Sequence, residues 1–237
     1  MTKRELIFTV FEKLGIENDD TDLTQEFVSS LIDNTRARLI KQTYGNKNWN
    51  IPIELRQELC MTLTPVDSIN GLSCSGTILR TNEIIPKGIS VKGGDGSVLR
   101  IKRYDREALQ INIVPIERLP LVGHNQWTAG MTYGAIDSDR RVYLVSPSQK
   151  HKMLEKVKIE GIYERPDDIW ELKCYEVSDT PTFGVVESSQ APCEPWDEEY
   201  PLEASMVDDI MNIILTDLNR TIQLPKDELN DSEDARG

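Results

Sequence analysis

The chain has 237 residues, enough for one large domain or two small ones, and 38% of them are hydrophobic, which is enough to build a core. Forty acidic residues against 27 basic ones give a formal net charge of −13, and a surface of that sign repels nucleic acid. No apolar run approaches the roughly 20 residues that span a bilayer, and the first residues mix charges with apolar side chains. We therefore expect a soluble globular protein with no signal peptide and no membrane partner.

The first helix is expected directly at the start of the chain. Thr2 and Glu5 form the T-x-x-E pattern of a capping box, a periodic set of apolar residues follows, and Gly15 stands where a helix commonly ends. A polar linker, 17–22, then leads to a second apolar stripe over 27–40 that ends near residues 44–45. The sequence therefore predicts two consecutive helices.

Three basic residues lie near the C-terminal end of the second predicted helix. Arg36, Arg38 and Lys41 have the charge that a helix C-terminus favours. Solvated side chains on an exposed face are a sufficient explanation for all three.

From residue 51 the hydrophobic period changes from that of a helix to two, the period of a strand. A turn of two aspartates, 137–140, and a glycine-rich hairpin loop, 93–96, separate some of the runs. About eight short strands are expected, at 59–64, 77–81, 89–91, 98–101, 111–114, 132–136, 141–145 and 155–163, with a further candidate at 170–175.

The last forty residues contain the most regular pattern of the chain. Apolar residues recur with helical spacing from Tyr200 to Leu218, and they form an unusually wide apolar face. A charged tail follows. Because the first forty residues are also helical, we expect the closing helix to return and pack on the two opening ones.

These elements predict an α+β fold, in which the N-terminal helices and a C-terminal helix pack together around an inserted antiparallel β-sandwich or small barrel. The predicted parts are an N-terminal helical part over 1–48, the β domain over 49–176, an acidic connector rich in Pro and Ser over 177–199, the C-terminal helix over 200–224 and a flexible tail over 225–237.

The four cysteines, Cys60, Cys74, Cys174 and Cys193, lie far apart and form no C-x-x-C pair. A zinc site is therefore not expected. Without a secretory signal, reduced and buried thiols are the default, so we assign the cysteines to packing.

The motifs that resemble enzyme signatures fail on inspection. The serines of 71–76 do not stand in G-x-S-x-G, and the glycines of 93–96 are not followed by the Gly-Lys-Ser/Thr of a phosphate loop. Asp137 and Asp139 match the first ligands of a calcium loop, but the later ligands are missing. His124 and His151 have no nucleophile nearby in the sequence. We therefore expect no catalytic, cofactor or metal site.

Two alternatives remain open at this point. Glu164, Asp167, Asp168 and Glu171 could supply a carboxylate pair for glycoside hydrolysis, although a solvated cluster explains them better. Trp127, Trp170, Trp196 and Tyr200 could form a platform for sugars, although their scattered positions favour roles in a core or an interface.

An apolar closing helix beside a charged tail is also suited to contact between subunits. The candidate interface residues are four from the helix and two aromatic residues just before it: Met206, Ile210, Ile213, Ile214, Trp196 and Tyr200.

The order of several motifs resembles the small structural proteins of crAss-like bacteriophages, in particular the ring proteins that join the portal to the tail. The likeness consists of the opening helices with TRARLI at 35–40, the run TILRTNEIIP at 77–86, RVYLV at 141–145, VKIEGIYERP at 157–166, and last the helix that begins YPL at 200–202, with its acidic tail.

The resemblance implies a subunit of a closed, dodecameric ring in the head-to-tail connector of a short-tailed virion, assembled in the host cytoplasm. Its partners would be further copies of itself, the portal protein and the adjacent tail ring proteins, and the genome would pass through its lumen without specific binding. An acidic channel wall is compatible with that role because it lets DNA slide. The resemblance brings no catalytic residue and no cofactor.

Overall fold

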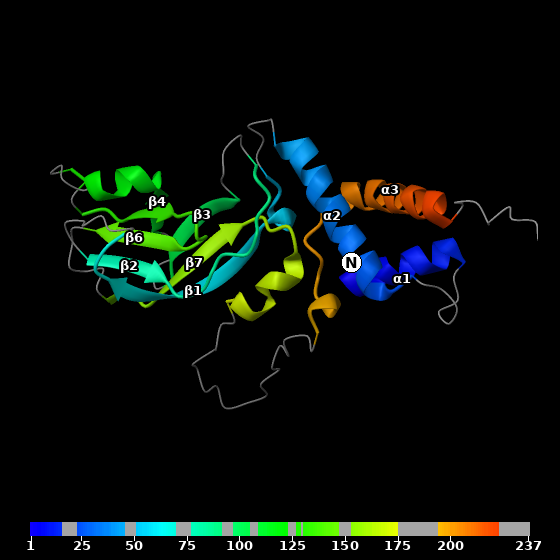
Figure 1. Ribbon diagram of the computed structural model, residues 1–237, viewed down its shortest axis with the longest axis horizontal. Helices are drawn as coiled ribbons and strands as arrows, with labels where there is room; N and C mark the ends of the chain where they lie inside the picture. The colour runs from blue at the N-terminus through cyan, green and yellow to red at the C-terminus, as the bar shows by residue number, and fades with distance from the viewer. Residues whose placement is uncertain are drawn as a thin grey trace, which may run out of the picture.

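A computed structural model describes residues 1–15, 23–45, 51–69, 77–91, 97–104, 109–122, 127–128, 130–146, 153–174 and 194–222, except for the side chains of 221 and 222. The described part is elongated, with a β-barrel at one end and three helices at the other (Figure 1). The expected loop at 93–96, both histidines, most of the acidic connector and the charged tail lie outside the described residues.

The first helix, α1 (Lys3–Leu14), has the predicted ends. The Thr2 side chain accepts a hydrogen bond from the Glu5 backbone N–H, and the Glu5 side chain accepts one from the Thr2 backbone, so the capping box is complete. Gly15 ends the helix in the left-handed region, at φ 65°. The second helix, α2 (Gln25–Tyr44), begins after Thr24, whose hydroxyl accepts from the Phe27 N–H.

The closing helix, α3 (Ala204–Ile222), packs on α1 and α2, as its apolar face predicts. It begins at Ala204 and not at Tyr200, because 200–203 is extended and runs between the barrel and α2 (Figure 1). The helical core is built from apolar residues of all three helices: Leu6, Ile7, Val10, Phe11, Val28, Ile32, Ile210, Met211, Ile214 and Leu218. We call the three helices with this core the helical unit.

Seven strands form a closed barrel in the order β1-β2-β6-β5-β4-β3-β7. Their bounds are β1 (Gln57–Val66), β2 (Thr77–Thr81), β3 (Val98–Arg103), β4 (Gln110–Ile113), β5 (Tyr133–Ile136), β6 (Val142–Ser146) and β7 (Lys156–Gly161). All neighbouring pairs are antiparallel except β4 with β5, which is parallel. Closure removes the exposed sheet edges that a sandwich would keep.

The strand alternation predicted for β1 is present. Leu59, Met61 and Leu63 point into the barrel core, and Cys60 and Thr62 alternate with them on the outer face. The α+β class and the return of the closing helix are therefore confirmed, and the β domain is a small barrel with one parallel pair and not a sandwich.

Two predicted strands are wrong. Residues 89–91 form no strand. Gly88 and Tyr163 form an isolated bridge beside them, the Ile89 N–H donates to the Ile162 oxygen, and Ile89 packs under the helices with Ile40. The candidate strand at 170–175 is instead the end of a 3-10 helix, η4 (Pro166–Leu172), as far as the structure describes it. A proline at the first helical position and two aspartates in the first turn favour a helical start there.

The expectation of reduced cysteines is wrong for two of the four. Cys60 on β1 and Cys174 just after η4 form a disulfide, with their Cα atoms 5.0 Å apart. The two cysteines are 114 positions apart in the sequence, and no local pattern indicates the pairing, because barrel closure is what brings η4 beside β1. Cys74 and Cys193 lie outside the described residues.

Candidate functional site between barrel and helices

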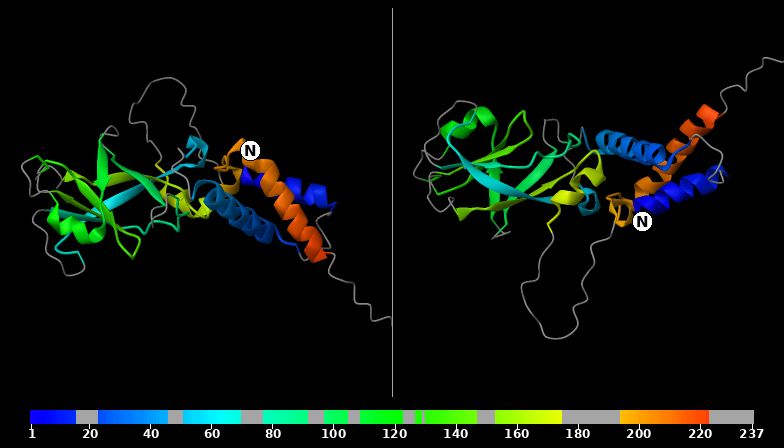
Figure 2. Two further views of the ribbon diagram at one scale, coloured as in Figure 1. Left: turned by 90° about the horizontal axis from the view of Figure 1, so that it is seen from above. Right: turned by 60° about the horizontal axis from the view of Figure 1, so that its bottom comes forward.

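The barrel and the helical unit meet at a buried polar cluster, which we call the junction: Lys3, Asp33, Arg36, Tyr163, Asp167, Trp196, Tyr200 and Pro201. These residues come from α1, α2, the residues just after β7, η4 and the segment 194–203, which contains the short 3-10 helix η5 (Pro195–Asp197). Figure 2 shows that segment running alongside the start of α1 before it enters α3.

Lys3 is the ionic centre of the junction. Its ammonium group lies 2.9 Å from a carboxylate oxygen of Asp33 on α2 and 2.5 Å from one of Asp167 on η4, and the side chain is 1% exposed. The indole N–H of Trp196 donates to the same Asp167 oxygen at 3.3 Å. One cation thus connects α1, α2 and the barrel side, and its burial makes this pairing obligatory.

Arg36 is the second buried cation. Its Nε donates to the backbone oxygen of Pro201 at 2.7 Å and its Nη1 to that of Tyr163 at 2.9 Å. The guanidinium also lies over the Tyr200 ring, 5.5 Å from its centroid. The interpretation of Arg36 as a solvated residue is therefore wrong: it is fully buried and joins α2 to the barrel.

Tyr200 completes the cluster. Its hydroxyl donates to Asp33 at 2.8 Å, and its backbone N–H donates to the Met1 oxygen at 3.0 Å. Beside it, Thr2 and Glu199 form an isolated antiparallel bridge. The first residues of the chain are therefore paired with the segment that leads into α3.

Burial governs the protonation of these groups. It raises the pKa of Asp33 above its usual range, and Lys3 opposes that shift without cancelling it. Burial likewise raises the pKa of Tyr200 well above 10 and lowers the pKa of Arg36. Each of these shifts disfavours the charged form of its group. The ion pair of Lys3 with Asp167 and the hydrogen bonds of Arg36 hold the two parts of the chain together.

A second ionic cluster lies on the adjoining barrel wall. Glu160 accepts from Arg56 at 3.0 Å and lies 3.2 Å from Lys102, while Glu58 lies within 3.5 Å of both Lys102 and Lys158. Burial alone would raise the pKa of Glu160, but the hydrogen bonds from Lys102 and Arg56 outweigh it and hold that pKa below its usual value.

The acids considered for glycoside hydrolysis are not brought together as a pair in a pocket. Asp167 is bound by Lys3, Glu164 pairs with Lys87 at 2.9 Å, and Asp168 and Glu171 are exposed. No group of metal-binding side chains occurs in the described part of the chain, where Asp137 and Asp139 form the predicted turn between β5 and β6.

The four aromatic residues also do not share one face. Tyr200 is buried, Trp170 and Trp196 are half-buried near the junction, and Trp127 is 84% exposed beyond η2 (Ile116–Leu121) on the barrel. The platform for sugars is therefore not formed.

The candidate interface residues have unequal places in the fold. Met206, Ile210, Ile214 and Tyr200 are buried within their own chain, whereas Ile213 and Trp196 are half-buried.

Sequence reasoning missed Lys3, Asp33 and Arg36 as partners. The sequence feature that could have indicated them is charge close to an apolar stripe. Asp33 directly follows the core residue Ile32, and Arg36 lies one helical turn after Ile32.

The arrangement defines a structural α+β subunit, in which a closed barrel is joined to a helical unit by the Lys3–Asp167 ion pair and the hydrogen bonds of the buried Arg36. A family model described as phage tail ring protein 2 matches residues 5–235. Ring protein 2 of Bacteroides phage crAss001 is 28% identical over 235 residues, which are 99% of this chain and 97% of that protein.

The chain belongs to the phage tail ring protein 2 family of crAss-like phages. The resemblance stated from the sequence is thereby confirmed, and the chain is a structural component of the virion tail. No helix in the described ranges is both long and apolar enough to cross a membrane.

Proposed function

We propose that the protein forms a closed ring, dodecameric as its resemblance implies, in the head-to-tail connector, where it joins the portal to the tail around the DNA exit channel. Its function is assembly and it catalyses no reaction. The tail ring family supports an oligomeric ring, and the adjacent tail ring proteins would be its further partners.

The observation that carries this proposal is the junction. Identical subunits close into a ring through two unlike surfaces, one meeting the other on the next copy, and the angle between those surfaces must be fixed. The barrel and the helical unit offer unlike surfaces, and the ion pair of Lys3 with Asp167 and the hydrogen bonds of Arg36 fix one against the other. A pair of domains joined by a loose linker would not hold a constant angle.

The charge distribution supports a place around DNA. Residues 51–174 hold 17 basic and 16 acidic residues, whereas the rest of the chain holds 10 basic and 24 acidic ones. The net charge of −13 therefore lies almost wholly outside the barrel. A channel lined by those acidic parts would repel DNA and let it slide.

The interface candidates divide by burial. Ile213 and Trp196 keep exposed surface that a neighbouring copy could cover, while the buried Met206, Ile210, Ile214 and Tyr200 would act by holding α3 in place. Exposed Phe8 and Phe27 on the helices extend the apolar surface available for contact.

Native mass spectrometry of the purified protein, alone and with its portal protein, tests the proposal. A discrete ring, or a monomer that joins a ring only on the portal, is the expected result. A monomer that ignores the portal would contradict it.

A further inference from the structure

A groove of about 880 Å³ lies on the barrel, lined by 85–88, the start of β3, the residues from the end of β4 into η2, and the turn between β5 and β6. The parallel pairing of β4 with β5 spans only two residue pairs, so the ends of β4 and β5 and the start of β3 open onto this groove. Its apolar lining includes Ile85, Val98, Ile113, Ile116 and Ile136. Ile113 is 41% exposed there, which leaves apolar surface in contact with water.

Arg140 stands at the rim of this groove in an unusual backbone conformation. It is the only non-glycine among the described residues with positive φ, at 59°, a region that costs about 1 kcal/mol for a residue with a side chain. Its backbone holds the turn, since its N–H donates to the Asp137 oxygen and its oxygen accepts from the Ile85 N–H. Its exposed guanidinium makes no ion pair with the described residues, unlike Arg141, which pairs with Asp139.

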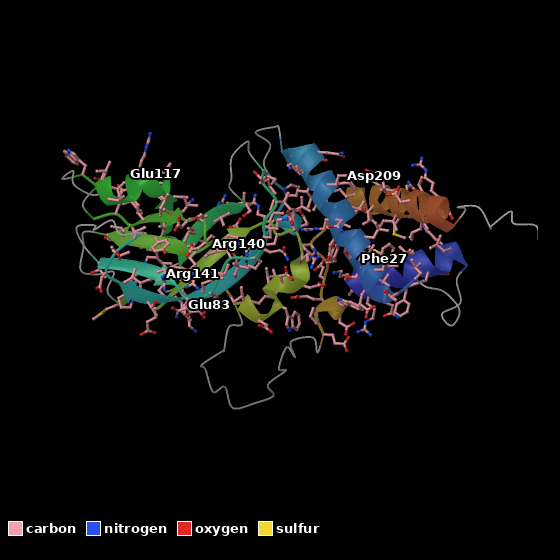
Figure 3. The ribbon with its side chains drawn as sticks, viewed as in Figure 1. Phe27, Glu83, Glu117, Arg140, Arg141 and Asp209 are labelled. Carbon is pink, nitrogen blue, oxygen red and sulfur yellow. A yellow bond between two sulfur atoms is a disulfide. The ribbon has the colours of Figure 1, made fainter. Side chains whose placement is uncertain are left out.

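The other charges at the rim leave Arg140 as the available cation. Lys87 is paired with Glu164 at 2.9 Å. Glu117 and Asp137 also line the groove, and Figure 3 shows Glu117 on η2, apart from Arg140. A suitable occupant therefore carries an apolar group for the groove and a carboxylate that reaches Arg140.

The helical unit of the same chain has this chemistry. Phe27, in the first turn of α2, is 52% exposed, and its neighbour Glu26 is exposed and makes no ion pair with the described residues. Figure 3 shows Phe27 on the helical unit and Arg140 on the barrel, displaced along the long axis. One copy can therefore present the start of its α2 to a neighbouring copy, while its own groove binds the start of α2 from another copy.

We propose that the groove of one subunit binds the start of α2 from a second copy, with Phe27 of that copy in the apolar groove and its Glu26 paired with Arg140. This inference rests on the proposed ring and names the two surfaces that meet in it. The contact is heterologous, as a cyclic ring requires.

Charge exchange tests the pairing. Ring formation is measured by native mass spectrometry, on the portal if the wild type needs it. Arg140→Glu and Glu26→Arg are each expected to weaken subunit association by about tenfold or more, and the double variant to restore most of it, because only the double variant again opposes unlike charges. Lys156→Glu, at the exposed start of β7 and outside the groove lining, makes the same change in charge and should assemble like the wild type.

Arg140→Gly keeps the proposal testable if Arg140→Glu misfolds, because glycine suits φ 59° and only the guanidinium is lost. It should fold at least as stably as the wild type and still assemble weakly. Normal rings from Arg140→Gly, or loss in both single variants without rescue in the double one, would overturn the pairing. A wild type that forms no ring in either setting would instead overturn the proposed function.

Discussion

Lys3 is a buried cation shared by two carboxylates, so its removal should be costly. In Lys3→Met the methionine fills similar space but leaves Asp33 buried without its cation, and we expect the free energy of unfolding to fall by about 3 to 5 kcal/mol. Urea titration at neutral pH measures this loss. Adding Asp33→Asn to Lys3→Met should recover much of it, because the uncompensated charge is then gone.

Lys13→Met, at an exposed site near the end of the same helix, is the control and should change stability by less than about 0.5 kcal/mol. A loss of equal size in both variants would mean that the ion pairs of Lys3 contribute nothing specific.

The lowered pKa of Glu160 should make the free energy of unfolding fall at acid pH. Its pKa is held below the ordinary 4.5 in the folded protein, so the unfolded chain binds the proton more tightly. The stability that this carboxylate contributes is fully present above about pH 4.5 and is lost as the pH falls through the lower, folded value.

The difference in unfolding free energy between the wild type and Glu160→Gln should therefore shrink as the pH falls from about 6 to about 3. Urea titrations across that range measure it, and the same neutralisation at exposed Glu155 controls for the change in net charge. A difference that stays constant with pH would contradict this explanation.

Among the elements, β1 is joined by the Cys60–Cys174 disulfide to the residues just after η4. Closing a loop of that length is expected to stabilise the fold by about 3 to 5 kcal/mol on the chain-entropy account. Thermal unfolding with and without a thiol reductant should show a lower Tm in the reduced wild type. The double variant Cys60→Ser, Cys174→Ser should have the lower Tm under both conditions, and a reductant effect that survives in it would point to another bond.

Within α3, Ile210 and Ile213 should differ in their roles: Ile210 should contribute to the stability of the fold, and Ile213 to contact between subunits. Ile210→Ala removes a fully buried side chain and should lower the free energy of unfolding by about 2 to 5 kcal/mol. Ile213→Ala, at a half-buried position, should cost less than about 1 kcal/mol and should instead reduce ring formation. Chemical denaturation and native mass spectrometry separate the effects, and an assembly as complete as that of the wild type would remove Ile213 from the interface.

Elements whose signals are local could be predicted from the sequence. The capping box of Thr2 and Glu5, the strand at 77–81 and the turn at 137–140 each depend on a few adjacent residues, and the structure contains all three. The helical face of α3 has a period that specifies burial whatever it packs against.

What could not be predicted depends on contacts between distant segments. The disulfide and the parallel pairing of β4 with β5 follow from closure of the barrel, which no local pattern specifies. Arg36 has the sequence context of a solvated residue, and only the approach of Tyr163 and Pro201 makes its position buried. The junction was therefore missed, although the helices and strands that form it were mostly expected.

At the scale of the whole molecule, the uneven charge predicts behaviour toward DNA. With a nearly neutral barrel and an acidic remainder, the protein should not retain a labelled duplex of about 30 base pairs at physiological salt. Fluorescence anisotropy measures binding of the duplex. The assembled ring is measured as well, because a channel through which DNA slides should not bind the duplex either. Saturable binding by the ring would contradict the acidic-channel explanation.

The pairing of residues 1–2 with 199–200 has a consequence for synthesis in the cell. A ribosome adds about 5 to 20 residues per second, so roughly 10 to 40 seconds separate the emergence of the two partners. During that interval α1 and α2 have no α3 to cover their apolar faces, while the barrel segment in between can already fold. A nascent chain therefore lacks the fixed angle between its two parts until residues 199–222 have emerged.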